Sequence, residues 1–151
     1  MITINNKNIA TVLHLSALTQ YIFPFGNYIF PLVIWSSKKD ESEFVNYNGK
    51  QVLNFQLSIF IYGVFLGLIA ILIFIYTLLK NVPFYPFFNN HDFVINHYNI
   101  IPINGIALIG IVAVLLFCFL KITEFVLIIH AAVKASNGEE YKYPLSIPFF
   151  K

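Results

Sequence analysis

Residues 57–79 have the sequence LSIFIYGVFLGLIAILIFIYTLL, and this stretch decides the fold. It is an unbroken apolar run of about 23 residues, long enough to cross a hydrocarbon core of about 30 Å as a helix. A helix is expected because a lone segment in lipid satisfies its backbone N–H and C=O groups only by bonding within itself. The sequence therefore predicts an integral membrane protein.

The composition agrees with a membrane environment. Hydrophobic residues make up 58% of the 151 residues and charged residues only 11%, with a mean hydropathy of +0.75, whereas soluble proteins carry roughly a quarter charged residues. All nine basic residues are lysines, so the arginine fork that suits phosphate is missing and no nucleic-acid partner is expected. We expect residues 1–151 to form a single membrane-embedded helical domain whose first partner is the lipid bilayer.

The first hydrophobic element, residues 9–37, is interrupted by a proline. Pro24 removes a helical hydrogen bond and its ring clashes with the preceding turn, so the element must bend or break between Pro24 and Asn27. It forms either one kinked crossing or a short helical hairpin with arms over residues 9–23 and 28–37. The expected fold class is all-α, with three main hydrophobic helical elements that make three to four helices: residues 9–37, 57–79 and 103–135.

The lysines indicate the topology, because cytoplasmic loops of membrane proteins carry an excess of positive charge. A hairpin places Lys7 on the same side as the lysines of the 38–50 loop and of the C-terminal segment, and leaves Lys80 as the only clearly external lysine. A kinked crossing places Lys7 on the opposite side. The count favours the hairpin, and either version predicts a multi-pass protein of the bacterial inner (cytoplasmic) membrane with a cytoplasmic C-terminus.

Small residues predict where helices pack against each other. Gly63 and Gly67 stand four residues apart, a pattern that lets a neighbouring helix approach closely. We expect this face to pack against the small residues in the first half of the 103–135 element. Those residues are Gly105, Ala107, Gly110 and Ala113.

Residues 44–56 alternate apolar and polar side chains, which predicts an interfacial elbow that leads into the central helix. A break at Asn48-Gly49 is one way for the elbow to form. At its end, Asn54 and Gln56 carry amides that hydrogen-bond either to neighbouring helices or within the fold.

Two charged residues lie inside the third hydrophobic element. Lys121 and Glu124 are three residues apart on one helix face, near enough to form an ion pair. Charges in a membrane helix are costly and often functional, so the pair has either a structural or a functional role.

Short strings over nearly the whole chain carry a family resemblance. They are His14-Leu15-Ser16-Ala17-Leu18, Pro24-Phe25-Gly26-Asn27, Pro31-Leu32, Lys38-Lys39-Asp40-Glu41-Ser42, Phe44-Val45, Gly49-Lys50, Leu53-Asn54-Phe55-Gln56, Ala135, Asn137-Gly138-Glu139 and Tyr141-Lys142-Tyr143-Pro144-Leu145. Together they resemble a bacterial membrane family called Tic-twenty-like, or domain of unknown function 4870. The resemblance implies a small helical membrane protein without known catalytic residues, an accessory subunit of a membrane complex or of protein-translocation machinery. The chain departs from the family in its long aromatic loop, residues 81–102.

No sequence motif indicates catalysis. The chain has no P-loop, no H-E-x-x-H motif and no nucleophile elbow, so we predict no enzymatic activity, no catalytic residue, no cofactor and no metal site. His91, Asp92 and His97 match no common spacing of metal ligands. The leading interpretation is a non-enzymatic membrane protein that acts through helix–helix contacts with other membrane protein subunits or with itself. Two alternatives stay open: a small oligomeric transporter or channel, and a haem-binding membrane protein that uses His14 and His130.

Overall fold

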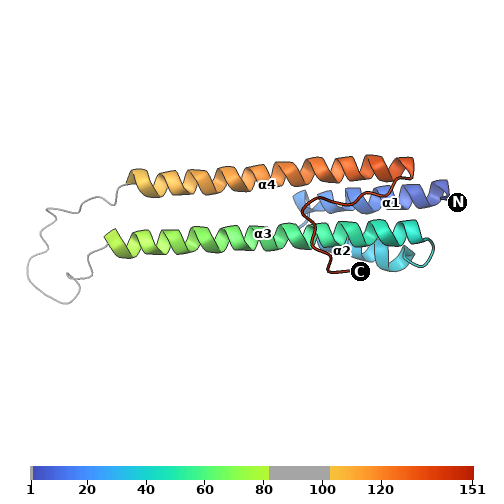
Figure 1. Ribbon diagram of the computed structural model, residues 1–151, viewed down its shortest axis with the longest axis horizontal. Helices are drawn as coiled ribbons and strands as arrows, with labels where there is room; N and C mark the ends of the chain where they lie inside the picture. The colour runs from blue at the N-terminus through green and yellow to red at the C-terminus, as the bar shows by residue number, and fades with distance from the viewer. Residues whose placement is uncertain (1, 82–102) are drawn as a thin grey trace, which may run out of the picture. The chain divides into compact units, whose positions relative to one another are not determined.

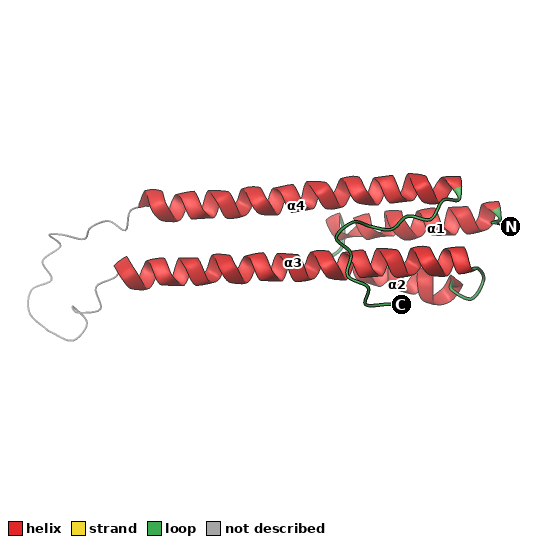
Figure 2. Cartoon of the chain, in the orientation of Figure 1, coloured by secondary structure: helices red, strands yellow, loops and turns green. Residues whose placement is uncertain are grey.

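The computed structural model describes residues 2–81 and 103–151, and within these residues it contains helices and loops but no strand (Figures 1 and 2). The elements are α1 (Ile4–Ser16), the 3-10 helix η1 (Ala17–Tyr21), α2 (Gly26–Lys38), α3 (Glu43–Asn81) and α4 (Ile103–Asn137). The predicted all-α fold class is confirmed. The aromatic loop, with His91, Asp92 and His97, lies almost entirely outside the described residues.

A tight turn separates η1 from α2 and reverses the chain. Pro24 lies in this turn, and Phe25, just before α2, adopts a left-handed conformation with φ of 62°. The Gly26 N–H donates to the Phe23 carbonyl over 3.0 Å and closes the turn. Because α2 then runs back beside α1 (Figure 1), the first hydrophobic element is a hairpin and not a single kinked crossing.

Two glycines allow close approach around α2. A Cβ atom on Gly26 would lie 2.6 Å from Thr19 Oγ1, and one on Gly49 would overlap the indole ring of Trp35. Gly49 therefore makes room for Trp35 and does not end a helix. The break considered at Asn48-Gly49 does not occur, since α3 runs without interruption from Glu43.

The two long helices exceed the thickness of a bilayer. α3 has 39 residues and α4 has 35, which correspond to about 58 and 52 Å against a hydrocarbon core of about 30 Å. Within them, Glu43–Tyr76 and Leu108–Asn137 are long and apolar enough to cross a membrane, since each contains an 18-residue window of high mean hydropathy, 2.8 in α3 and 2.5 in α4. Only 11% of each apolar window is buried in the protein, so these are not the covered core helices of a soluble fold.

A glycine ends α4. Gly138 has φ of +83°, its N–H donates to the Ala135 carbonyl over 2.9 Å, and the Glu139 N–H donates to the Lys134 carbonyl over 3.0 Å. This pair of bonds is the Schellman motif, in which a left-handed residue satisfies the last carbonyls of a helix. It directs the C-terminal segment, residues 139–151, away from the helix axis.

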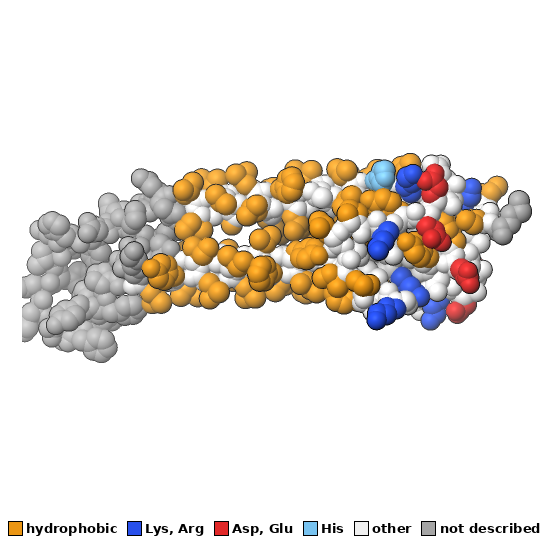
Figure 3. All heavy atoms as spheres, viewed as in Figure 1, with side chains coloured by type: hydrophobic (Ala, Val, Ile, Leu, Met, Phe, Trp, Pro, Cys, Tyr) orange, Lys and Arg blue, Asp and Glu red, His pale blue; other side chains and the backbone are white. Residues whose placement is uncertain are grey.

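The described residues divide into two compact units, each considered by itself. The first unit contains the residues up to Tyr62 together with Leu120–Lys151, and the second contains the described residues of Gly63–Phe119. The first unit has an apolar core made of Leu13, Ala17, Val45, Val52, Phe55, Ile59, Ile128, Ala131 and Tyr143. In the second unit most described apolar side chains are exposed, and Figure 3 shows hydrophobic side chains along the whole described length of its helices.

Substitution by alanine should change the stability differently at Gly49, which packs against Trp35, and at Gly67, which has no neighbour. We expect Gly49→Ala to lower the free energy of unfolding in detergent by about 1 to 3 kcal/mol, because the new methyl group displaces the Trp35 ring. Gly67→Ala is the matched control, since no atom lies within 4 Å of its Cβ position. We expect its effect to be stabilising by up to about 1 kcal/mol, from helix propensity alone. Equal destabilisation by both substitutions would contradict the packing described here.

Candidate functional site: a buried polar network and an apolar groove

His14 joins three segments of the first unit. Its side chain is fully buried on α1, and both ring nitrogens have a partner. Nδ1 lies 2.9 Å from the Tyr143 hydroxyl, and Nε2 lies 2.8 Å from Asn48 Oδ1. The imidazole therefore connects α1 to α3 and to the C-terminal segment.

Asn48 fixes the protonation state of His14. The Asn48 amide nitrogen donates to the Phe44 carbonyl over 2.8 Å, so Oδ1 faces the imidazole as an acceptor. Nε2 must then carry the hydrogen, and Nδ1 accepts from the Tyr143 hydroxyl. Burial lowers the pKa of His14 from 6.5 to about 4, although the hydrogen bond to Asn48 opposes this shift. The ring is consequently neutral at neutral pH.

Tyr143 is the part of the C-terminal segment that enters the core. It is 2% exposed, and its ring stacks on Phe55 with centroids 4.1 Å apart and planes at 9°. Burial raises the pKa of Tyr143 well above 10, and the charges of Tyr141 and Glu124 add to this effect. The hydroxyl therefore stays protonated and donates a hydrogen bond to His14 Nδ1.

An ion pair with an amide partner joins η1 to α4. Glu124 is fully buried, and its Oε2 accepts from Lys121 Nζ over 2.8 Å. Its Oε1 accepts from Gln20 Nε2 over 2.9 Å, while Gln20 Oε1 accepts from Lys121 Nζ over 3.1 Å. The predicted pair of Lys121 and Glu124 forms, and Gln20 completes a three-membered ring of hydrogen bonds around the buried carboxylate.

Gln56 and Asn54 on α3 bond to different segments of the first unit. Gln56 is fully buried, and its Oε1 accepts from Asn27 Nδ2 of α2 over 2.7 Å. Asn54 Oδ1 accepts from the N–H groups of Phe149 and Phe150, over 3.0 and 2.8 Å, and its Nδ2 donates to the Phe150 carbonyl over 3.0 Å. Both amides therefore act within the fold, which is one of the two roles expected for them.

The C-terminal segment is held along α3 by further hydrogen bonds. Ser58 Oγ accepts from the Ile147 N–H over 2.8 Å, and the Tyr62 hydroxyl donates to the Leu145 carbonyl over 2.7 Å. Lys50 Nζ donates to the Lys151 carbonyl over 2.7 Å. The segment has no regular secondary structure, but its polar backbone groups are tied to successive turns of α3.

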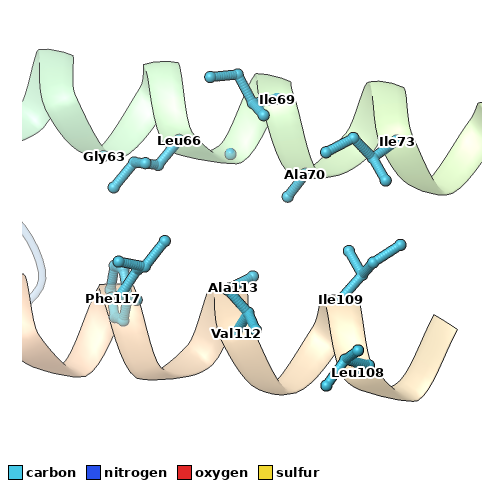
Figure 4. A pocket seen from close by; sticks show the side chains of 12 residues that line it. Gly63, Leu66, Ile69, Ala70, Ile73, Leu108, Ile109, Val112, Ala113 and Phe117 are labelled. Carbon is cyan, nitrogen blue, oxygen red and sulfur yellow. The ribbon is translucent and has the colours of Figure 1, made fainter. Parts of the chain in front are cut away.

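The second unit contains an apolar groove between α3 and α4 (Figure 4). Its volume is about 480 Å³, and its wall includes Gly63, Gly67, Ala70 and Ala113 with larger aliphatic side chains. No atom of another segment lies within 4 Å of the Cβ positions of Gly63, Gly67 or Gly110. In this structure Gly63 and Gly67 therefore do not pack closely against α4. The small-residue face is open.

The pairing of His14 with His130 around one iron is not supported. Both ring nitrogens of His14 are already engaged in hydrogen bonds. His130 is exposed, and its ring makes an edge contact with Tyr141 at a centroid distance of 5.1 Å. Within the described residues, no group of three or more histidine, cysteine or acidic side chains is placed to hold a metal ion.

Sequence reasoning missed part of the polar network. Gln20 was not considered, and Asn27, Asn48 and Tyr143 were not predicted to form hydrogen bonds, although each is a polar residue within or beside an apolar run. Their position in the sequence could have indicated that they form hydrogen bonds, since a polar group in an apolar segment needs a partner. The identity of each partner was not available, because the paired residues are up to 129 positions apart.

Two long apolar helices with exposed side chains, a short hairpin and a core of buried polar side chains are typical of a helical membrane protein. A family model matches residues 5–150, nearly the whole chain. The chain belongs to the magnetosome magnetite crystal formation protein family (MamF/MmsF), and it is a bacterial membrane protein. No curated protein and no solved structure matches it.

The family match corrects the resemblance drawn from the sequence. The short strings suggested a Tic-twenty-like family, but the family model that matches is the magnetosome one. The translocation role implied by the resemblance is withdrawn with it.

The neutral state of His14 predicts a loss of stability in mild acid. The pKa of His14 is 6.5 when unfolded and about 4 when folded, so between these values the unfolded chain binds the extra proton. The contribution of neutral His14 to the free energy of unfolding is fully present above pH 6.5. It is lost as the pH falls toward 4, by about 3 kcal/mol in total.

Unfolding free energies in detergent at pH 7 and pH 4.5 test this, with His14→Gln as the comparison. The carboxylates titrate in both proteins, whereas only the wild-type chain carries the imidazole. We expect the wild-type protein to lose more stability than the variant over this range. Parallel losses would show that His14 is not the group responsible.

Proposed function

We propose that this chain is a non-enzymatic component of the magnetosome membrane that acts through lateral helix contacts. It would contact a second copy or another membrane protein and so influence the growth of the magnetite crystal. The observation that carries the proposal is the open small-residue face of the second unit, around Gly63 and Gly67. Faces of this kind allow close contact between membrane helices, where packing and not the hydrophobic effect drives association.

The polar network supports a structural role for the polar residues. Lys121, Glu124, Asn54 and Gln56 hold segments of the first unit together. A catalytic group in an active site is commonly exposed to a cleft with a shifted pKa, whereas these side chains bond to one another or to the backbone. The apolar lining of the groove gives no support to a polar transport path.

The charges of the first unit support an orientation. Seven lysines belong to it besides Lys121, namely Lys7, Lys38, Lys39, Lys50, Lys134, Lys142 and Lys151. Lys7 Nζ donates to the Asn137 carbonyl over 3.3 Å, so the start of α1 lies beside the end of α4. By the positive-inside rule, we propose that this end of the first unit faces the cytoplasm and that the membrane is the inner membrane or one derived from it.

Single cysteines test the orientation in intact cells. With Cys118→Ser as the background, we expect Asn5→Cys, Asp40→Cys and Ser136→Cys to remain unlabelled by a membrane-impermeant thiol reagent until the membrane is opened. Labelling of all three in intact cells would reverse the orientation. Labelling of Asn5→Cys alone would contradict the hairpin.

Cross-linking tests the lateral contact. In a Cys118→Ser background, we expect Gly67→Cys to give a cross-linked product in native membranes. Phe65→Cys is the matched control, because residue 65 lies at a similar depth on α3 but is 63% exposed and does not line the groove. In cells whose only copy of the protein is the variant, Gly67→Leu should change the size of the magnetite crystals, whereas Phe65→Leu should not. Equal cross-linking at both positions, or at neither, would count against the proposal.

A further inference from the structure

The tip of the α1–α2 hairpin exposes a run of large apolar residues. All five residues of the turn and its approach, Tyr21 to Phe25, are exposed, with Ile22 at 90% and Phe25 at 68%. The outer face of α2 continues this surface with Ile29, Phe30, Leu32 and Val33. An apolar surface of this size on a small chain indicates a contact with something other than water.

Six polar side chains of the hairpin are buried or half-buried against the protein. Their hydrogen bonds go either to the backbone of their own helix or to other segments of the first unit. The residues concerned are Thr11, His14, Ser16, Thr19, Gln20 and Asn27. No Asp, Glu, Lys or Arg occurs between Lys7 and Lys38. The apolar surface is therefore free of charge from the tip to the open end of the hairpin, where Lys7, Lys38 and Lys39 begin.

The hairpin is too short to cross a bilayer. α2 has 13 residues, or about 20 Å, whereas the hydrocarbon core is about 30 Å thick. α1 and η1 are longer together, with 13 and 5 residues, but α2 returns the chain to Lys38, beside the lysine-bearing start of α1. With its lysines at the headgroups, an inserted hairpin reaches into one leaflet and turns there. The backbone of the turn favours this, because the N–H groups of Ile22, Phe23 and Gly26 donate to backbone carbonyls and Pro24 has no N–H.

The exposed face fits lipid better than another helix. Close contact between membrane helices uses small residues or polar groups that bond across the interface. The outer face of α2 offers bulky and β-branched side chains instead, including Phe30 and Val33. In this chain the small-residue face belongs to Gly63 and Gly67, in the other unit.

We propose that the α1–α2 hairpin is inserted tip first into a single leaflet and gives the protein a preference for curved membranes, with the hairpin in the convex leaflet. The physical reason is that the hairpin adds volume to one leaflet and not to the other. A helix that crosses the membrane displaces lipid from both leaflets, whereas the hairpin displaces lipid from one only, and binding of such elements depends on curvature. This proposal does not depend on lateral helix contacts.

The depth of the tip can be measured in liposomes of phosphatidylcholine and phosphatidylglycerol. The full chain, with Cys118→Ser, carries a spin label at Ile22→Cys or, as a reference at the open end, at Asn5→Cys. We expect the label at position 22 to be accessible to oxygen and protected from a water-soluble nickel reagent, and the label at position 5 to show the opposite. A tip label accessible to nickel would overturn the proposal, as would one shielded from both reagents, since the latter indicates a second copy or another protein covering the tip.

Curvature preference is measured on the same proteins with a fluorescent label. We expect the protein density on liposomes of about 50 nm diameter to exceed that on liposomes of about 400 nm by about two-fold or more. Ile22→Glu should abolish this ratio, because a charge at the tip opposes insertion while the side chain it replaces makes little contact within the fold. Asn5→Glu is the matched control, with the same added charge at the exposed open end, and should keep the ratio. A wild-type ratio near one, or equal loss in both variants, would overturn the proposal.

Discussion

A polar group withdrawn from water costs free energy unless it has a hydrogen-bond partner, and in the first unit most buried polar side chains have one, although Gln56 Nε2 does not. His14, Gln20, Asn27, Asn54 and Gln56 each come from an apolar stretch, and each is bonded to a segment distant in the sequence. Their partners lie on α2, α3, α4 and the C-terminal segment. Because apolar side chains attract one another without direction, these bonds supply much of the specificity that sets which segment lies beside which.

The helices could be predicted from the sequence because lipid permits so few alternatives. Length and hydropathy were enough to find the central helix, but not its start, which lies at Glu43 and not after an elbow over residues 44–56. Pro24 was enough to place the break before α2. Each of these conclusions uses only neighbouring residues, and local chemistry is sufficient for them.

The packing could be predicted only in part. The pair of Lys121 and Glu124 was found because both residues lie on one turn of one helix, but the third member, Gln20, lies 101 residues or more away. The glycines show the same limit. Gly63 and Gly67 had the expected spacing and lie open, whereas Gly49, in a less regular setting, accommodates Trp35. Whether a glycine meets a neighbour depends on where the other helices lie, and spacing within one helix does not contain that information.

The C-terminal segment also constrains the order in which the protein can be completed. Asn54, Ser58 and Tyr143 make their contacts only when residues 139–151 are in place, yet α1, α2 and most of α3 leave the ribosome long before that segment. During synthesis these helices must enter the membrane with several of their polar groups temporarily bonded to water or lipid headgroups. Biogenesis therefore has a late closing step, in which the last residues made exchange those temporary partners for permanent ones.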